Sequence, residues 1–566
     1  RAGVVDVPGH EDFVRTMVAG ASGIDVVLLV VAADDGIMPQ TLEHLAIVEQ
    51  LGVARGIPVL SKVDLVDAEW AALVAADLAE RLARSPVSFT PPIPVSTVTG
   101  QGIEELRAAL AAVARSVTAR DAADLVRLPV DRAFSVAGTG TVVTGTLWSG
   151  RIRVGDQVAL LPGRERARVR SIEQYGQAVD VAGPGSRTAL GLAGVAREAI
   201  RRGMVVVEPE RGWEEVPTID VVASLLADAP RPLVSRTRVR LHLGTAEVIC
   251  RVYPPAPIEP GGSGAARLRL EQPLIARGGD RFILRSFSPV TTIGGGFVVD
   301  PMPPGGKPCW SDALLTQEPA ARLAGLVARR RDGVAIAEMP ILLGATVKED
   351  SGGDIVRLGA RLVSPGRAAE LAQRALDLVR QFHRDSPTEA GLAIETLRQQ
   401  LGAPAALVEP VLERLVAARR LVLSDGRARL TGFAPRVPGR PADVERVVAL
   451  VAAAGLMPPT VAELAAAHGL EDAGAILAFA AASGRVVAVE RDRFYAREAL
   501  DQLVAALREI GASGPITPAA VRDRLGLTRK YVIPLLEWAD RAGVTVRVGE
   551  GRKLAGLRSD TSAPVC

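Results

Sequence analysis

The fold is decided by the stretch Val4-Val5-Asp6-Val7-Pro8-Gly9-His10-Glu11, close to the start of this 566-residue chain. Its valines are typical of a strand buried in a parallel sheet, and Pro8-Gly9 would end that strand. Asp6 would then lie near the carboxyl end of the strand, where open α/β sheets bind ligands. A carboxylate there suits Mg²⁺, directly or through water, and the amide of Gly9 suits a phosphate.

On the Asp-x-Pro-Gly pattern alone, a phosphate site and an ordinary strand-turn-helix corner fit equally well. His10 favours the phosphate site, because an imidazole just beyond the glycine can orient an attacking water. We therefore expect a phosphate-binding corner here, with His10 as its candidate catalytic residue.

The composition of the chain limits its class. The chain is 48% hydrophobic and 23% charged, and a net charge of +3 says little about partners. Its three cysteines lie far apart and fit neither a disulfide framework nor a C-x-x-C metal site, so a reducing cytoplasm is expected. No apolar run is long enough, without charges or breakers, to predict a membrane span, and no signal peptide is visible.

Residues 1–115 alternate strand and helix patterns, which predicts a doubly wound α/β sheet. Three further apolar runs mark its strands, at 24–33, 57–60 and 93–95. Polar loops follow the last two runs. The Asp64 carboxylate can accept two N–H groups from guanine while the stem of Lys62 covers the base, and adenine lacks that paired donor edge. Taken singly, a Lys-x-Asp tripeptide is more often a solvated ion pair.

Four motifs of this segment together resemble the translational GTPases. They are D-V-P-G-H-E-D-F from Asp6, A-A-D-D-G-I-M-P-Q-T from Ala32, S-K-x-D from Ser61 and S-x-x-T-G-x-G-I from Ser96. The resemblance implies that GTP and Mg²⁺ are the cofactors, with Asp6 in the Mg²⁺ shell through a water and Gly9 at the γ-phosphate. It makes His10 the residue that positions the hydrolytic water. The residues implied to hold guanine are Ser61, Lys62, Asp64 and Ser96.

Two features depart from the pattern of that family. Ser61 stands where the family usually has Asn, which removes an amide that braces the phosphate loop. The phosphate loop G-x-x-x-x-G-K-[ST] and the first switch are absent from the sequence, which begins at Arg1 inside a strand-forming run. We therefore expect an N-terminally truncated, partial GTPase domain over 1–120. GTP hydrolysis is then expected of the full-length parent, and this chain is expected to be inactive.

Two segments that follow are predicted to form antiparallel β-barrels, at 121–210 and 211–305. In both, Val-rich alternation and glycine turns replace the helix patterns. The strings Asp131–Phe134 and Gly138–Gly145 resemble the second domain of the elongation factor Tu class. Thr292–Gly296, followed by Asp300-Pro301, resembles the third domain of one branch of that class, the selenocysteine-specific elongation factors.

The resemblance also implies an aminoacyl pocket on the second domain. It places Asp131, Arg132 and Arg187 near the selenocysteyl group of a bound tRNA. Because a selenol is ionised at neutral pH, Arg187 would pair with the selenolate, and Asp131 would hold the α-amino group. An ordinary ion pair on the barrel surface is an equally weighted reading of these residues.

Residues 311–566 repeat a module of roughly 60 residues in which three helix patterns precede a β-hairpin, as in a winged helix. Four copies are predicted, at 311–366, 369–434, 440–497 and 498–560. The fourth copy is basic, with nine Lys or Arg and four Asp or Glu between Arg522 and Arg558. Scattered charge usually means a solvated helix face. The candidate RNA contacts of this copy are Arg529, Lys530, Tyr531, Arg547, Arg552 and Lys553.

The segment T-R-K-Y-V-I-P-L-L-E, from Thr528, resembles the terminal winged helix of the bacterial selenocysteine factor, which in that family holds an mRNA hairpin. The leading hypothesis is a monomeric, cytoplasmic GTP-dependent factor. It would carry selenocysteyl-tRNA to the ribosome and be tethered to the message hairpin by its winged helices. One alternative is a winged-helix RNA- or DNA-binding regulator with an inert truncated GTPase domain. Another is an ordinary translational GTPase with an unrelated tail.

Overall fold

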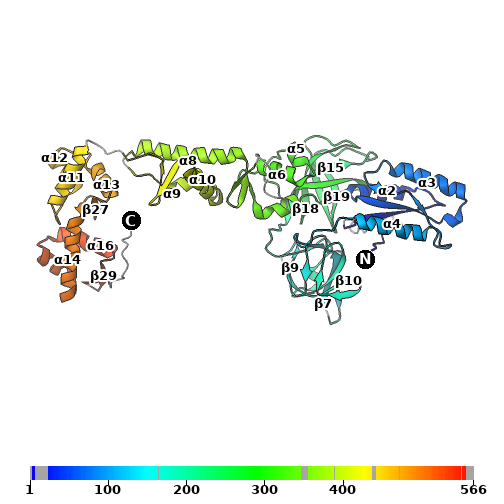
Figure 1. The fold of residues 1–566 in the computed structure, drawn as a ribbon, viewed down its shortest axis with the longest axis horizontal. Coiled ribbons are helices and arrows are strands. Elements are labelled where there is room, and N and C mark those ends of the chain that lie inside the picture. Colours follow the sequence, from blue (N-terminus) through cyan, green and yellow to red (C-terminus); the bar gives the residue numbers. More distant parts are fainter. Residues whose placement is uncertain are drawn as a thin grey trace. The chain divides into compact units, whose positions relative to one another are not determined.

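The computed structural model describes most of the chain, and Figure 1 shows its helices and strands. The described residues are 3–6, 23–138, 140–163, 165–345, 355–387, 389–435, 441–470, 472–549 and 551–555. The chain divides into two compact units, Arg1–Pro365 and Gly366–Cys566, each with cores of its own. No helix among the described residues is long and apolar enough to cross a membrane.

The first part of the first unit is the predicted α/β sheet. Its strands are β1 (Val26–Ala32), β2 (Arg55–Ser61), β3 (Ser88–Phe89) and β4 (Ile93–Pro94), and its helices are α2 (Pro39–Gln50), α3 (Ala68–Leu82) and α4 (Ile103–Ser116). β2 runs parallel to the other three strands. Leu60 of β2 packs toward α2 and α3, whereas Ile57 and Val59 pack toward α4. Helices therefore cover both faces, which confirms the doubly wound sheet (Figure 1).

The stretch around Asp6 differs from the prediction. Gly3–Asp6 is not part of a strand, and Val4 is 86% exposed. A strand is stable only when a neighbour pairs with it, and among the described residues β1 pairs with β2 alone. The buried strand expected at Val4–Val5 is therefore wrong for the residues that the structure describes.

The second part of the first unit is an eight-stranded antiparallel sheet. Its strands, in the order of the sheet, are β5 (Arg127–Pro129), β14 (Val205–Val207), β9 (Gln157–Leu161), β10 (Glu165–Gln174), β13 (Arg187–Ala193), β7 (Gly140–Thr146) and β6 (Arg132–Val136), with β11 (Gln177–Val179) beside β10. A separate pair is formed by β8 (Ile152–Arg153) and β12 (Val181–Ala182). A bridge between Arg127 and Ser149 brings the chain after β7 onto β5, so the sheet curls around one apolar core.

The third part is a closed barrel of six strands. Neighbouring strands in the barrel are β15 (Val216–Leu225), β18 (Ser263–Leu274), β17 (Ala246–Tyr253), β16 (Thr237–Leu243), β19 (Arg281–Ser286) and β20 (Thr292–Asp300). Its core includes Ile219, Leu241 and Phe282, as expected when alternate residues of each strand point inward. Both β-rich parts expected from the sequence are confirmed.

The first winged helix packs on this barrel and shares a core with it. Its elements are α5 (Asp312–Leu315), α6 (Pro319–Ala328), β21 (Val334–Ala335), η4 (Ile336–Glu338), α7 (Met339–Leu343), β22 (Val356–Leu358) and β23 (Arg361–Val363). Phe297 and Val299 of β20 lie in one apolar cluster with Leu323 and Leu326 of α6. The first winged helix therefore belongs structurally with the barrel.

Glycines allow the barrel and the first winged helix to approach closely. The N–H of Gly278 donates to the carbonyl of Ile341 at 2.8 Å. A Cβ atom on Gly278 would lie 1.9 Å from the carbonyl oxygen of Leu342. A Cβ atom on Gly344, whose φ is +74°, would lie 1.8 Å from the carbonyl oxygen of Gly278. This packing therefore requires glycine at both positions.

A buried ion cluster also joins the barrel to the first winged helix. The carboxylate of Asp220 accepts from Nε of Arg267 at 2.7 Å and from Nη2 of Arg329 at 2.6 Å. The carboxylate of Asp300 accepts from Arg329 at 3.1 Å and from Arg330 at 2.7 Å. Both aspartates are 0% exposed, so these charges have left water and depend on one another.

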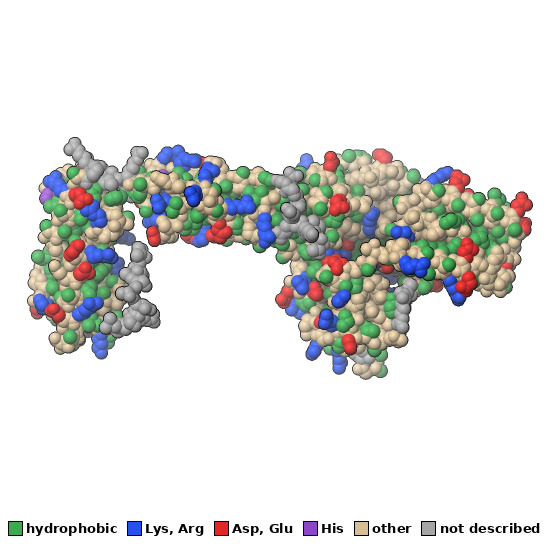
Figure 2. All heavy atoms as spheres, in the orientation of Figure 1, with side chains coloured by type: hydrophobic (Ala, Val, Ile, Leu, Met, Phe, Trp, Pro, Cys, Tyr) green, Lys and Arg blue, Asp and Glu red, His purple; other side chains and the backbone are tan. Residues whose placement is uncertain are grey.

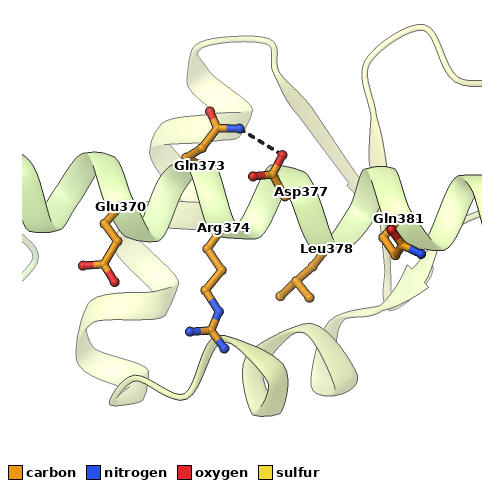
Figure 3. A pocket seen from close by; sticks show the side chains of 6 residues that line it. All are labelled: Glu370, Gln373, Arg374, Asp377, Leu378 and Gln381. Carbon is orange, nitrogen blue, oxygen red and sulfur yellow. Dashed lines mark hydrogen bonds between the residues drawn. The ribbon is translucent and has the colours of Figure 1, made fainter.

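The second winged helix lies at the start of the second unit. It consists of α8 (Pro365–Asp385), β24 (Leu392–Ala393), α9 (Ile394–Leu401), α10 (Ala405–Ala417), β25 (Leu421–Ser424) and β26 (Arg427–Leu430). A hollow of about 490 Å³ runs along α8 (Figure 3). Gln373 there donates to Asp377 on the same helix at 3.0 Å, and Arg374 donates to the carbonyl of Gln400 at 2.9 Å. These are ordinary contacts of a helix surface, and we assign no site to the hollow.

The third and fourth winged helices follow and confirm the tandem repeat. The third consists of α11 (Pro441–Ala453), α12 (Val461–His468), α13 (Ala473–Ala482), β27 (Val486–Ala488) and β28 (Phe494–Ala496). The fourth consists of α14 (Arg497–Ser513), α15 (Pro518–Leu525), α16 (Arg529–Arg541), β29 (Thr545–Val548) and β30 (Gly551–Leu554). Val489 and Tyr495 of the third lie in one core with Leu500 and Leu536 of the fourth, so these two modules pack as a pair.

His383, near the end of α8, is buried without a hydrogen-bond partner. The residue is 7% exposed, and its ring stacks on Phe433 with the ring centroids 3.5 Å apart. Neither ring nitrogen has a partner among the described residues. Burial, and to a lesser degree the charge of Arg429, lower the pKa of His383 below its ordinary value of 6.5. The folded chain therefore favours the neutral imidazole.

Because His383 is buried in its neutral form, we expect the second unit to lose stability in acid. Between the lowered folded pKa and the unfolded pKa, the unfolded chain binds more protons, so stability falls as the pH falls through that window. We expect the second unit to melt at a lower temperature at about pH 5.5 than at about pH 7.5, with at most about 1.4 kcal/mol per pH unit from this group. Calorimetry should show a shallower pH dependence in His383→Phe than in the unmodified chain. An equal slope in both would contradict this prediction.

Candidate functional site

The carboxyl ends of β1 and β2 bring the predicted guanine residues to one edge of the sheet. The two strands pair with Ala32 opposite Ser61, so the loops that follow lie side by side. Nζ of Lys62 donates to both carboxylate oxygens of Asp34, at 3.0 and 3.1 Å, and lies 3.5 Å from Asp35. The hydrogen bond with Lys62 lowers the pKa of the Asp34 carboxyl, and the same bond raises the pKa of Lys62. Asp34 therefore holds the ammonium at this edge.

The backbone fixes the same loop. The backbone of Lys62 has the left-handed conformation, with a φ of +56°, and this residue precedes the short helix η2 (Val63–Leu65). Asp64 lies in that helix, exposed and without a hydrogen bond to any described residue. The hydroxyl of Ser61 donates to the carbonyl of Val31 at 3.3 Å. Ser61 thus joins two strands of the sheet, while both oxygens of Asp64 stay available to a ligand.

Ser96 shapes the neighbouring loop from inside. It is 0% exposed, and its Oγ accepts from the N–H groups of Val98 at 3.2 Å and Thr99 at 3.1 Å. The N–H of Val63 donates to the carbonyl of Val95 at 3.5 Å, which fixes this loop beside the Lys-x-Asp loop. Two amides of the Ser96 loop are therefore used within the loop itself.

The phosphate side of the predicted site is not assembled by the described residues. Asp6 is exposed, and no hydrogen bond or ion pair joins it to another described residue. Gly9 and His10 lie outside the described residues. The structure thus brings the guanine-side residues together and leaves the roles of these three residues as predictions.

Arg187 and Asp131 form an ion pair on the second domain. Nη1 of Arg187 lies 2.7 Å from Oδ2 of Asp131, and the side chain of Arg187 is 46% exposed. Oδ1 of Asp131 accepts from the hydroxyl of Thr144 at 2.6 Å. Arg132 is exposed on β6, where Thr144 of β7 is its register partner, and it forms no ion pair with a described residue.

This pair has unused hydrogen-bonding capacity. A guanidinium carries five N–H donors, and the bond to Asp131 uses few of them, so the exposed part of Arg187 is free to meet an anion. Thr144 fixes the carboxylate that orients Arg187, and sequence reasoning missed it. Its only signal was its place in the Gly138–Gly145 string, because a threonine in a strand rarely marks a site.

The fourth winged helix presents most of its predicted RNA contacts to solvent. Arg529 and Lys530 are exposed at the start of α16, where backbone amides and the helix dipole favour a phosphate. Arg547 and Lys553 are exposed on the wing. On the face drawn in Figure 2, Lys and Arg side chains of the second unit lie among Asp and Glu side chains. An RNA contact would therefore be local to the helix start and the wing.

The ring of Tyr531 is less accessible to a base than predicted. Its ring is half-buried, with Cζ of Arg493 at 5.1 Å from the ring centroid and Nζ of Lys530 at 5.7 Å. Two cations therefore already contact this ring. Stacking of Tyr531 on a base remains a prediction, and it would require one of these cations to move.

Arg552 is buried, unlike the other predicted RNA contacts on the wing. It is 7% exposed, and its Nε donates to the carboxylate of Asp540 at 2.8 Å. Side chains alternate along β30, so Arg552 turns toward the core and Lys553 toward solvent. The guanidinium of Arg552 supports the fold, and its burial beside Asp540 does not favour the RNA contact predicted for it.

Comparison with known proteins matches several segments of the chain to families. Residues 1–116 match the family described as "Elongation factor Tu GTP binding domain", and 140–207 match "Elongation factor Tu domain 2". Residues 220–305 match "Selenocysteine-specific elongation factor, beta-barrel domain". Residues 376–430 and 508–554 match two families described as "Elongation factor SelB, winged helix".

A relative that aligns along nearly the whole chain decides the family. The selenocysteine-specific elongation factor of Desulfomicrobium baculatum is 35% identical over 587 residues, which cover 98% of this chain and 91% of the relative. The chain belongs to the selenocysteine-specific elongation factors. The Escherichia coli (strain K12) member is 31% identical, over 98% of this chain and 90% of its own length. The crystal structure of a bacterial selenocysteine-specific elongation factor has a TM-score of 0.67 at 25% identity, over 97% of this chain and 89% of that one.

Family membership decides between the three hypotheses. This selenocysteine-specific elongation factor is a translational GTPase with a guanine-nucleotide-binding domain. Its predicted fold class is confirmed, from the GTPase domain through two β domains to the tandem winged helices. A regulator with an inert GTPase domain and an ordinary translational GTPase with an unrelated tail are not favoured, because the matches extend through the winged helices.

Proposed function

We propose that this factor binds GTP and selenocysteyl-tRNA and delivers the tRNA to the ribosome at recoded UGA codons. Its C-terminal winged helices hold a hairpin of the selenoprotein message, and it works as a monomer in the cytoplasm. The observation that carries the proposal is the half-exposed guanidinium of Arg187, held by Asp131 on the second domain. We also propose that the domains begin and end at the residues predicted from the sequence.

The guanine side of the nucleotide site fits its proposed ligand. Asp64 has both carboxylate oxygens available to the paired N–H groups of guanine, and Asp34 holds Lys62 beside it. The buried hydroxyl of Ser96 keeps its loop in shape against the base. We assign guanine recognition to Lys62, Asp64 and Ser96, with Ser61 fixing the strand end behind them.

The phosphate side is proposed from family membership. Mg²⁺ usually keeps several waters and takes only one or two carboxylates together with the phosphates of a nucleotide, so the single carboxylate of Asp6 is compatible with it. When bound, Mg²⁺ neutralises charge on the β- and γ-phosphates. Gly9 would offer its amide to the γ-phosphate, and the His10 imidazole would orient the attacking water.

The aminoacyl site selects by charge. A selenolate is an anion at neutral pH, whereas the hydroxyl of serine is neutral, so a guanidinium distinguishes the two groups. Asp131 keeps lone pairs for an α-ammonium group even while it accepts from Thr144 and Arg187. Arg187 is thus assigned to the selenolate and Asp131 to the amino group, with Arg132 beside them on the surface.

Selenocysteyl-tRNA should bind the full-length protein with GTP about tenfold or more tightly than seryl-tRNA, because only the former offers an anion to Arg187. Arg187→Met should remove most of this preference, since it keeps the length of the side chain and loses the charge. Arg151→Met, at an exposed site of the same domain, is the control. Equal affinity of the unmodified protein for both tRNAs, measured by filter binding, would contradict the proposal.

Substitutions of two adjacent wing residues, Arg552 and Lys553, should separate an effect on RNA binding from an effect on folding. Lys553→Met should weaken binding of a selenoprotein-message hairpin and leave thermal unfolding unchanged. It should also make the plot of the logarithm of the binding constant against the logarithm of the salt concentration less steep by about one. Arg552→Met should lower the free energy of unfolding of the fourth winged helix by about 2 kcal/mol, because it removes the charged partner of Asp540 and leaves that carboxylate with the hydroxyl of Thr545 alone among the described residues. RNA titration at several salt concentrations and thermal unfolding check the pair. If the control Arg508→Met weakened binding as much as Lys553→Met does, the wing would have no special role.

A further inference from the structure

The strand that carries Arg187 is paired on one side only at that residue. β13 begins at Arg187, and β7 pairs with it there, with Thr146 opposite Arg187. The ladder between β13 and β10 reaches only to Thr188, which lies opposite Gln174. On the β10 side, the backbone at Arg187 therefore lacks, among the described residues, the strand pairing that fixes the rest of β13.

Two consecutive residues, the last of β10 and the first of the turn that follows it, hold the chain on that side. Nε2 of Gln174 donates to the hydroxyl of Thr188 at 2.9 Å. The hydroxyls of Tyr175 and Ser186 lie 2.9 Å apart and share a hydrogen bond. The hydroxyl of Thr188, which is 1% exposed, donates to the carbonyl of Ser186 at 3.1 Å. The residues before and after Arg187 are thus both held by side chains at the end of β10.

The backbone of Tyr175 has a conformation that tyrosine rarely adopts. With Gly176 it forms the two-residue loop of the hairpin between β10 and β11, because Gln174 pairs with Gln177. The φ of Tyr175 is +54° and that of Gly176 is +72°. Loops of this kind favour Asn or Asp before the glycine, since a larger side chain on Cβ makes the left-handed region costly. A tyrosine in this place therefore indicates a side chain whose role outweighs the local preference.

The side chain of Tyr175 lies beside the candidate aminoacyl site. Tyr175 is 44% exposed, and its hydrogen-bond partner Ser186 directly precedes Arg187, whose side chain is also exposed. The ring lies near the GTPase domain as well, since a Cβ atom on Gly3 would be 3.7 Å from Cε1 of Tyr175. The two parts of this side chain can be tested separately, because phenylalanine keeps the ring and lacks the hydroxyl.

We propose that Tyr175 is a positioning residue of the aminoacyl site, and that its hydroxyl holds Ser186 and so fixes where the guanidinium of Arg187 meets the selenolate. This inference rests on the function proposed above for Arg187. Asp131 orients the end of the Arg187 side chain, and the bond between Tyr175 and Ser186 fixes the backbone from which that side chain extends. A guanidinium that moves over a wider range pairs less well with an anion, because charge-assisted hydrogen bonds depend on geometry. A neutral seryl group forms no such pair, so its binding does not depend on Tyr175.

The test is filter binding of both tRNAs by the full-length protein with GTP. In Tyr175→Phe we expect the affinity for selenocysteyl-tRNA to fall about threefold to tenfold, the effect of one net hydrogen bond. The affinity for seryl-tRNA and the unfolding temperature should stay unchanged, whereas a residue that only supports the fold would affect both tRNAs alike. Tyr253→Phe is the control, because the hydroxyl of Tyr253, in the barrel, forms no hydrogen bond with a described residue.

A double-mutant cycle shows whether the hydrogen bond itself is responsible. Ser186→Ala removes the same bond from the other side, so it should weaken selenocysteyl-tRNA binding as Tyr175→Phe does, and the double variant should bind no more weakly than either single variant. Full affinity in Tyr175→Phe, or losses that add in the double variant, would overturn this inference alone. Equal affinity of the unmodified protein for the two tRNAs would overturn the proposed function, and this inference with it.

Discussion

Replacing Asp220 by asparagine is expected to lower the free energy of unfolding of the first unit by about 3 to 5 kcal/mol. Asp220 is 0% exposed and accepts hydrogen bonds from Arg267 and Arg329. Asparagine has nearly the same shape but no charge, so the buried Arg267 would lose the carboxylate with which it pairs. The hydrogen bond with Asp220 raises the pKa of Arg267. An arginine side chain keeps its charge in proteins even without such a partner, so this guanidinium stays charged when Asp220 is replaced.

This prediction is checked by thermal or urea unfolding of the chain, with Trp310 fluorescence as one probe, because Cζ of Arg329 lies 5.8 Å from the centroid of that ring. Glu271→Gln is the matched control. Glu271 pairs with Arg238 at 2.9 Å, but both side chains are nearly 40% exposed, so its loss should cost at most about 1 kcal/mol. Similar losses in both variants would mean that the buried cluster contributes no more than a surface pair.

Gly278→Ala is expected to destabilise the contact between the barrel and the first winged helix by about 3 kcal/mol, the upper end of overpacking effects. The added methyl group would lie 1.9 Å from the carbonyl oxygen of Leu342, and backbone on both sides prevents it from moving aside. The hydrogen bond from Gly278 to Ile341 would be strained as well. Hydrogen exchange should therefore rise in α6 and α7 more than in the α/β sheet.

Gly305→Ala is the matched control for this substitution. A Cβ atom there would meet no atom within 4 Å, and the residue lies in the same unit. We expect its unfolding temperature and exchange pattern to match those of the unmodified chain. If Gly278→Ala also left the exchange of α6 and α7 unchanged, the two parts would not depend on this close approach.

The general architecture could be predicted because it depends on local patterns. A strand covered by helices on both faces needs a continuous apolar run, and 24–33 predicted β1 at Val26–Ala32 for that reason. Strict alternation likewise marked the β-rich parts. The same reasoning failed at Val4–Val5, because an apolar run forms a strand only if a neighbouring strand pairs with it.

The sites were predicted less completely, because their partners are distant in sequence or depend on the face of a strand. Asp124 and Arg277 are 153 positions apart, and nothing in either local sequence indicates that they meet. Arg552 and Lys553 are adjacent and similar in charge, yet one is buried and the other exposed. Only the position of β30 relative to α16 decides which of them faces Asp540.

The core shared by the barrel and the first winged helix has a consequence for how the chain can be divided. Phe297 and Val299 of β20 are covered by α6, so a fragment that stops near residue 305 would expose them to water. A fragment that stops at Pro365 keeps them covered. In a chimera with a relative, the smallest portion that can be exchanged without opening this core is therefore the barrel together with its first winged helix.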